Sequence, residues 1–196
     1  MLSRRVMLLT PLAMTAARLG SAASAKMTLA LHQNTSAAAG YRASLEGWAR
    51  AGIKNVEITA AQLDAFVKTD SLAAAGRVLT DNGLTPVSAA CGVGGLWEPN
   101  PNHAASLDAL KQRCEMFAGL GLTHIYAPVG GMQKFTEGDY TTGAENMRQA
   151  GDVAKQFHLT MTAEFTRGSA FISTLTTMLK LTRAAAHPNV KPLLDC

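Results

Sequence analysis

Short apolar runs alternate along this chain with longer stretches in which apolar residues recur every three or four positions. Each short run is bounded by polar residues or glycine, as buried parallel strands are. The pattern therefore predicts six parallel β-strands separated by helices. The predicted strands are Met27–Leu31, Asn55–Thr59, Thr85–Cys91, His124–Val129, Leu159–Phe165 and Val190–Cys196.

The stretches between these runs have the periodicity of helices with one apolar face. The second predicted helix has the clearest ends, since Asp70 or Ser71 can cap its start and Asn82-Gly83 can close it. His187-Pro188 stops the last helix. The five predicted helices cover residues 41–52, 72–81, 107–120, 147–157 and 171–186.

Two α/β architectures produce this alternation, the doubly wound sheet and the (β/α)₈ TIM barrel. A doubly wound fold would carry a glycine-rich phosphate loop after its first strand, where this chain has His32–Thr35. Gly92–Gly95 follows the third strand, but it leads into Trp97-Glu98-Pro99 and opens no helix. The barrel is therefore favoured. Eight units need roughly 230 to 260 residues, so we expect a truncated or partial barrel of about six βα units.

Composition supports a globular domain. The chain has 196 residues, of which 47% are hydrophobic and 16% charged, and it has three cysteines, too few for a disulfide scaffold. Cys91 and Cys114 lie in apolar surroundings and are interpreted as small core residues. No apolar run reaches the roughly 18 to 20 residues of a membrane-spanning helix, so stable membrane insertion is not expected.

Residues 1–25 have the features of a secretory signal peptide. Arg4 and Arg5 precede an apolar stretch over residues 6–17, and Ala23-Ser24-Ala25 is a small-x-small cleavage site. The start also resembles the twin-arginine export motif, which predicts a periplasmic protein whose partial barrel domain covers residues 26–196. The alternative is an irregular N-terminus with a chance Arg-Arg pair, in a cytoplasmic protein.

Net charge argues against a nucleic-acid partner. The formal charge is +4, but residues 1–25 contribute +3 through Arg4, Arg5 and Arg18. The remaining chain has 15 basic and 14 acidic side chains and no basic stripe interleaved with aromatics. Binding to phosphate backbones needs such a stripe, so no nucleic-acid partner is expected.

Two carboxylates stand at predicted strand ends, which is where TIM barrels place their chemistry. Glu164 closes the fifth strand and Asp195 the sixth. Carboxylates in apolar strands need partners, and two of them at one barrel mouth suit a divalent ion such as Mg²⁺. Added imidazole would favour Mn²⁺, Co²⁺ or Zn²⁺. The structural alternative is that Glu164 pairs with Arg167 at the rim.

Four further side chains are candidates for substrate binding. His32 can bind a sugar hydroxyl or cap the first loop, and Glu57 can support the site or pair with Lys54 or a loop amide. Trp97 can form an apolar wall for a sugar ring or anchor its loop on the barrel rim. Arg167 is the fourth candidate.

These motifs resemble the sugar phosphate isomerase/epimerase superfamily, the xylose-isomerase-like TIM barrels. The resemblance rests on Val56-Glu57-Ile58, Ala163–Arg167 and Pro192–Cys196. It implies that Glu164 and Asp195 are the first two ligands of a divalent metal ion. A His from strand seven and a Glu from strand eight would follow beyond Cys196. Epimerases in the superfamily use two glutamates as an acid/base pair, of which this chain holds Glu164.

The resemblance implies a metal-dependent isomerase or epimerase that acts on a sugar or a related polyol-ketone. The export motif favours a free sugar, since phosphorylated sugars are mainly cytoplasmic. A homo-oligomer is a further expectation. A lyase or dehydratase on an inositol-like substrate is an alternative in the same barrel, because it also begins with proton abstraction. A phosphodiester-cleaving endonuclease is disfavoured by the low charge. The alternative of another class is an exported sugar-binding protein without activity, or an inactive truncated chain.

Overall fold

The computed structural model describes residues 28–131 and 134–195, and the predicted signal peptide over residues 1–25 lies outside them. Six strands form one parallel sheet in the order of the chain. They are β1 (Leu31–His32), β2 (Asn55–Thr59), β3 (Thr85–Ala90), β4 (His124–Pro128), β5 (Thr160–Glu164) and β6 (Val190–Leu193).

The inner strands match the sequence prediction to within one residue at each end, and the two outer strands are shorter than predicted. β1 holds two residues and pairs with β2 only through Leu31 and His32. β6 ends at Leu193. Within the described residues both strands have a neighbour on one side only, so fewer ladder hydrogen bonds extend them.

The helices are 3₁₀ helix η1 (Gln33–Ala39), α2 (Gly40–Arg50), α3 (Ala60–Val67), α4 (Leu72–Asp81), α5 (His103–Gly119), α6 (Glu137–Gln156) and α7 (Leu175–Ala185). Ser71 caps α4 as predicted, with its hydroxyl accepting from Ala74 N at 3.1 Å. The prediction missed η1 and α3, and it placed the start of α6 ten residues too late. A capping box between Thr136 and Asp139 begins α6 well before its apolar face.

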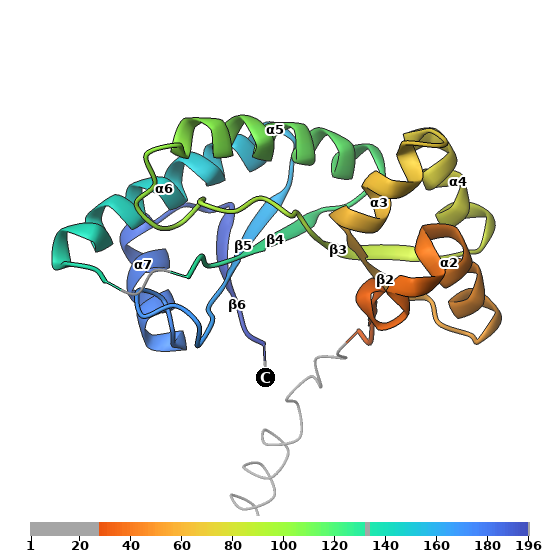
Figure 1. Cartoon of the computed structure of the whole chain (residues 1–196), viewed down its shortest axis with the longest axis horizontal. Coiled ribbons are helices and arrows are strands. Elements are labelled where there is room, and N and C mark those ends of the chain that lie inside the picture. Colours follow the sequence, from red (N-terminus) through yellow and green to blue (C-terminus); the bar gives the residue numbers. More distant parts are fainter. Residues whose placement is uncertain (1–27, 132–133, 196) are drawn as a thin grey trace, which may run out of the picture.

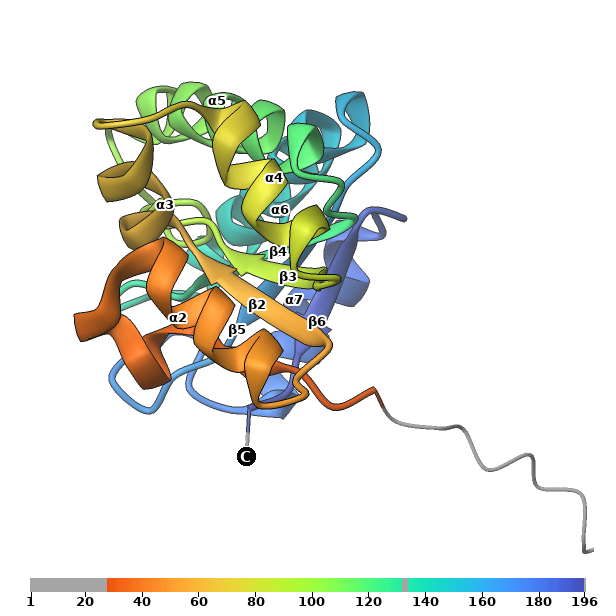
Figure 2. The same cartoon turned by 90° about the vertical axis from the view of Figure 1, so that its right-hand side faces the viewer.

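The helices follow one another around the outer side of a curved sheet (Figure 1). The view turned by 90° shows the strands in the middle of the molecule, with α4 and α5 above them and α2 beside β2 (Figure 2). An α/β arrangement of six parallel strands with their helices is a partial TIM barrel. The predicted fold class is confirmed.

The core lies between the sheet and the helices. Along β4 and β5 the side chains alternate, with Ile125, Ala127, Met161 and Ala163 fully buried. The residues between them are partly or largely exposed on the other face of the sheet. Cys91 and Cys114, both free, are fully buried, which confirms them as core residues.

No helix in the described part of the chain combines the length and the hydropathy that crossing a membrane requires.

Candidate active site

A cavity of about 450 Å³ lies at the carboxyl ends of the strands. The side chains that line it come from β1, β2, β4 and β5 and from the residues at the end of β6. They are His32, Glu57, Tyr126, Glu164, Leu193, Leu194 and Asp195. The structure thus brings together four of the residues singled out in the sequence, namely His32, Glu57, Glu164 and Asp195. The strand order explains this, because the ends of parallel strands meet at one edge of a curved sheet.

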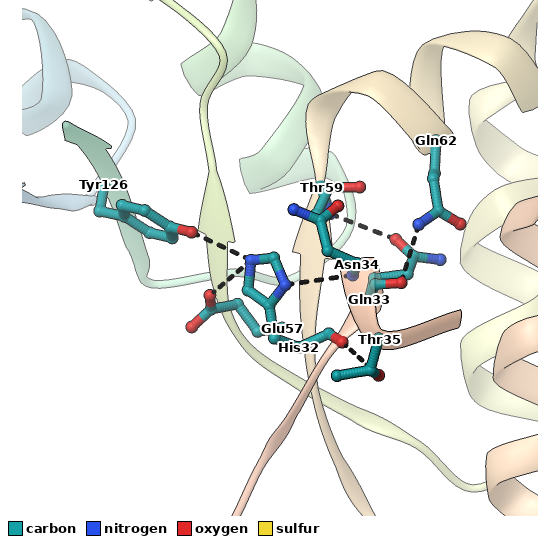
Figure 3. Close-up of polar contacts among 8 residues, drawn as sticks. All are labelled: His32, Gln33, Asn34, Thr35, Glu57, Thr59, Gln62 and Tyr126. Atoms are coloured by element: carbon teal, nitrogen blue, oxygen red, sulfur yellow. Dashed lines mark hydrogen bonds and ion pairs between the residues drawn. The ribbon is translucent and has the colours of Figure 1, made fainter. Parts of the chain in front are cut away.

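Glu57 lies in a triangle of polar side chains on β1, β2 and β4 (Figure 3). His32 Nε2 is 3.2 Å from Glu57 Oε1 and 3.1 Å from the hydroxyl of Tyr126. Burial raises the pKa of Glu57, while His32 and the hydroxyl of Tyr126 oppose that rise. Within the described residues, Glu57 therefore interacts with two side chains of the site, and not with Lys54 or a loop amide, which were its predicted structural partners.

The ring of His32 has a defined tautomer. The backbone N–H of Asn34 donates to Nδ1 over 3.1 Å, so Nδ1 carries a lone pair. The ring proton of the neutral imidazole then sits on Nε2, which faces Glu57 and Tyr126. His32 caps the first loop through one nitrogen and presents a hydrogen-bond donor to the cavity through the other. Both roles predicted for His32 as alternatives are therefore geometrically available at once.

Glu164 and Asp195 form a carboxyl pair at the ends of β5 and β6. Burial raises the pKa of Glu164, and the negative charge of Asp195 and a hydrogen bond to its carboxyl raise it further. Two carboxyls this close either share a proton or hold a cation between them.

The donor set of this pair fits a hard divalent cation, since both groups offer carboxylate oxygens at adjacent strand ends. Within residues 28–131 and 134–195, no three His, Cys, Asp or Glu side chains are grouped closely enough to hold an ion by themselves. The fit therefore rests on Glu164 and Asp195 as two ligands of a larger set.

Arg167 lies apart from the cavity. Its side chain is exposed, and no ion pair joins it to Glu164 in the described part of the chain. The predicted rim pair between Glu164 and Arg167 is wrong, because Glu164 contacts Asp195 instead. Nothing in the arrangement supports the substrate-binding role predicted for Arg167.

Trp97 corrects a second prediction. Its side chain is fully buried, and its indole N–H donates to the carbonyl of Ala127 in β4 over 3.0 Å. A ring without exposed surface has no face to offer a sugar. Trp97 is therefore the anchor of the loop between β3 and α5, which is the structural alternative given above.

Tyr126 is the site residue that the sequence analysis missed. It lies in the middle of β4, between the buried residues Ile125 and Ala127. Its pKa is raised by burial and by the neighbouring carboxylates Glu57, Glu164 and Asp195. The period of two along β4 was the available signal, because it sets Tyr126 on the face opposite the apolar residues.

Comparison with known proteins finds the same fold elsewhere. A family model described as xylose isomerase-like TIM barrel matches residues 45–196. A xylose isomerase domain protein from Alicyclobacillus acidocaldarius subsp. acidocaldarius is 19% identical with a TM-score of 0.70, and the match covers 86% of this chain and 63% of that one. The IolI protein with a binding zinc atom is 17% identical with a TM-score of 0.75, over 86% and 63%. D-psicose 3-epimerase with D-tagatose, from Clostridium cellulolyticum H10, is 19% identical with a TM-score of 0.71, over 85% and 62%.

The chain thus spans less than two thirds of the length of each of these three solved proteins. At such identities the likeness is one of fold. No curated protein matches the chain.

Proposed function

We propose that this chain, which belongs to the xylose isomerase-like TIM barrel family, is a metal-dependent isomerase or epimerase acting on a sugar or related polyol-ketone. One observation carries the proposal. His32, Glu57, Glu164 and Asp195 come from four strands and line one cavity of about 450 Å³ with Tyr126. Such a cavity has room for a monosaccharide and offers it both hydrogen-bond donors and a carboxylate base.

Glu164 is the proposed catalytic base. Burial and the charge of Asp195 raise its pKa, which strengthens it as an acceptor of a proton from carbon. The carbon–hydrogen bond next to the carbonyl breaks toward Glu164, and its electron pair forms a carbon–carbon double bond while the carbonyl oxygen gains negative charge. For the epimer, a proton from solvent adds to the opposite face of the same carbon, and Glu164 releases to solvent the proton that it took. For the isomer, the proton on Glu164 adds to the former carbonyl carbon, and the hydroxyl proton of the first carbon passes to the former carbonyl oxygen.

His32, on the opposite side of the cavity from Glu164, is proposed to orient the substrate. His32 presents its Nε2–H to the cavity, where Glu57 and Tyr126 are its partners. A sugar oxygen that takes the place of one of these partners receives a hydrogen bond from a ring already held in position. Glu57 and Tyr126 remain close enough to bind neighbouring hydroxyl groups.

Glu164 and Asp195 are the side chains that would hold the divalent ion, since they are paired oxygen donors at adjacent strand ends. When bound there, the ion supplies polarisation of the substrate carbonyl. The zinc atom of the IolI structure and the sugar in the epimerase structure belong to proteins of this fold and are consistent with the proposal.

Exchange of substrate hydrogen for solvent deuterium tests the proposal, because proton abstraction precedes either outcome. The full chain is incubated in D₂O with Mn²⁺ and a panel of unphosphorylated ketohexoses, and ¹H NMR follows the signals beside the carbonyl. We expect exchange with at least one sugar and formation of its epimer or isomer. Glu164→Gln is expected to lower the rate by roughly 100-fold or more, the usual contribution of a positioned acid/base group.

Glu115→Gln is the matched control, since Glu115 is exposed on α5 and lies outside the cavity. Equal exchange rates for the two variants would show that Glu164 takes no part in the reaction. Undiminished exchange in EDTA would show that the reaction needs no metal ion. A dehydrated product in place of an epimer would assign the chain to the lyase alternative.

A further inference from the structure

β1 is the shortest strand of the sheet, yet it carries His32. The strand contains two residues, and its ladder to β2 consists of Leu31 opposite Val56 and His32 opposite Glu57. The other strands contain four to six residues. So short a ladder leaves the end of β1 poorly fixed, and contacts outside the ladder must hold it.

Gln33 supplies those contacts. It directly follows His32, and its side chain is fully buried on the side away from the cavity (Figure 3). Its Oε1 accepts from the backbone N–H of Thr59 over 3.2 Å, which ties it to the end of β2. Its Nε2 lies 3.4 Å from Ser44 Oγ and 3.5 Å from the carbonyl of Tyr41, both in α2.

The backbone of Gln33 is held as well. The side-chain amide of Gln62 in α3 donates to the carbonyl of Gln33 over 2.9 Å. This peptide joins Gln33 to Asn34, whose N–H donates to Nδ1 of His32. The carbonyl and the N–H belong to one planar unit, so fixing the first orients the second.

We propose that Gln33 is a positioning residue that holds His32 in the tautomer with its proton on Nε2. The buried amide fixes the turn after β1, the turn aims the N–H of Asn34 at Nδ1, and that hydrogen bond leaves Nε2–H as the donor toward the cavity. Loss of the amide frees the turn, and the ring then samples both tautomers and further orientations. The catalytic consequence rests on the proposed function, but the tautomer does not.

The test is the nitrogen spectrum of His32 in the full chain labelled with ¹⁵N-histidine, recorded without substrate at pH 8. His32→Gln assigns the signals among the five histidines. The wild type is expected to show an unprotonated Nδ1 and a protonated Nε2. Gln33→Met keeps the length of the side chain and removes its hydrogen bonds, so we expect signals averaged between the two tautomers.

Asn146→Leu is the matched control. Asn146 is a buried amide in α6 that donates to the carbonyl of Glu98 over 3.0 Å, so its loss disturbs the core without touching β1. Its spectrum is expected to match that of the wild type. If Gln33→Met does not fold, Ser44→Ala decides, because it removes one partner of Gln33 and is expected to populate the second tautomer in part.

A wild-type nitrogen pattern in Gln33→Met, or in Ser44→Ala where that variant decides, would overturn the inference. Activity separates it from the proposed function. If the wild type exchanges deuterium, Gln33→Met is expected to lower kcat by roughly tenfold or more, since general acid/base geometry contributes on that scale. A wild type without exchange contradicts the proposed function, and the tautomer of Gln33→Met still decides the role of Gln33.

Discussion

The two faces of the sheet are built for different purposes. On the outer face, residues such as Ile58, Ile125 and Met161 are fully buried against the helices. On the inner face, their neighbours along the same strands are Glu57, Tyr126 and Thr162, all only partly buried. Side chains one position apart in the sequence thus meet an apolar core or a polar cavity, because successive residues of a strand point to opposite faces.

This contrast separates stability from chemistry. Apolar burial on the outer face provides most of the free energy of folding. The inner face gathers ionisable groups whose burial costs free energy, as the raised pKa values of Glu57 and Glu164 show. A group kept in an unfavourable environment is a candidate for function, and here several of them line one cavity.

The largest effect on stability is expected from a substitution on the outer face. Met161 in β5 is fully buried, so Met161→Ala leaves a cavity between sheet and helices. We expect the free energy of unfolding to fall by about 2 to 5 kcal/mol. Urea unfolding followed by circular dichroism measures this. A loss below about 1 kcal/mol would mean that the outer face is not the close-packed core described here.

The next residue along β5, Thr162, lies on the other face of the sheet and is expected to contribute less to stability. Thr162 points to the inner face, and its hydroxyl donates to the carbonyl of Ile125 over 3.3 Å. Thr162→Ala removes that hydrogen bond and is expected to cost only about 0.5 to 1.5 kcal/mol by the same urea measurement. A cost equal to that of Met161→Ala would contradict the difference between the faces.

The smallest effect concerns the buried thiols. Burial raises the pKa of Cys91 to about 11 and that of Cys114 to about 12. Thiols in the unfolded chain ionise at lower pH, so their contribution lowers stability as the pH rises from about 9 toward 11. At pH 8 we expect iodoacetamide to leave both residues unmodified in the native chain and to label them in urea, as read by peptide mass spectrometry. Rapid native labelling would show that the core opens.

Much of the fold was predictable from the sequence, because apolar runs and helical periodicity reflect burial directly. Asn55–Thr59 was predicted without error, and Ser71 was predicted as a cap. β1 was misplaced because two residues of an edge strand leave little pattern. Helix α3 was missed because it begins directly after β2, so the two apolar segments run together.

The site was predictable in part. Strand-end position identified Glu164 and Asp195 as candidates, and Glu57 was identified inside the second strand, since a carboxylate stands out in an apolar run. The contacts that these carboxylates make depend on the distances between neighbouring strands. The sequence of any one strand does not encode those distances. Trp97 shows the limit, because its exposure is decided by how the loop packs on β4. The export signal and a homo-oligomer stay predictions.

Mn²⁺ binding to the full chain tests the central claim most directly, which is that the inner face forms a metal-dependent site around Glu164 and Asp195. Electron paramagnetic resonance of free Mn²⁺ measures affinity without a substrate. We expect the wild type and Glu115→Gln to bind alike, and Glu164→Gln or Asp195→Asn to weaken binding by roughly tenfold or more. Equal binding by all four proteins would contradict the account.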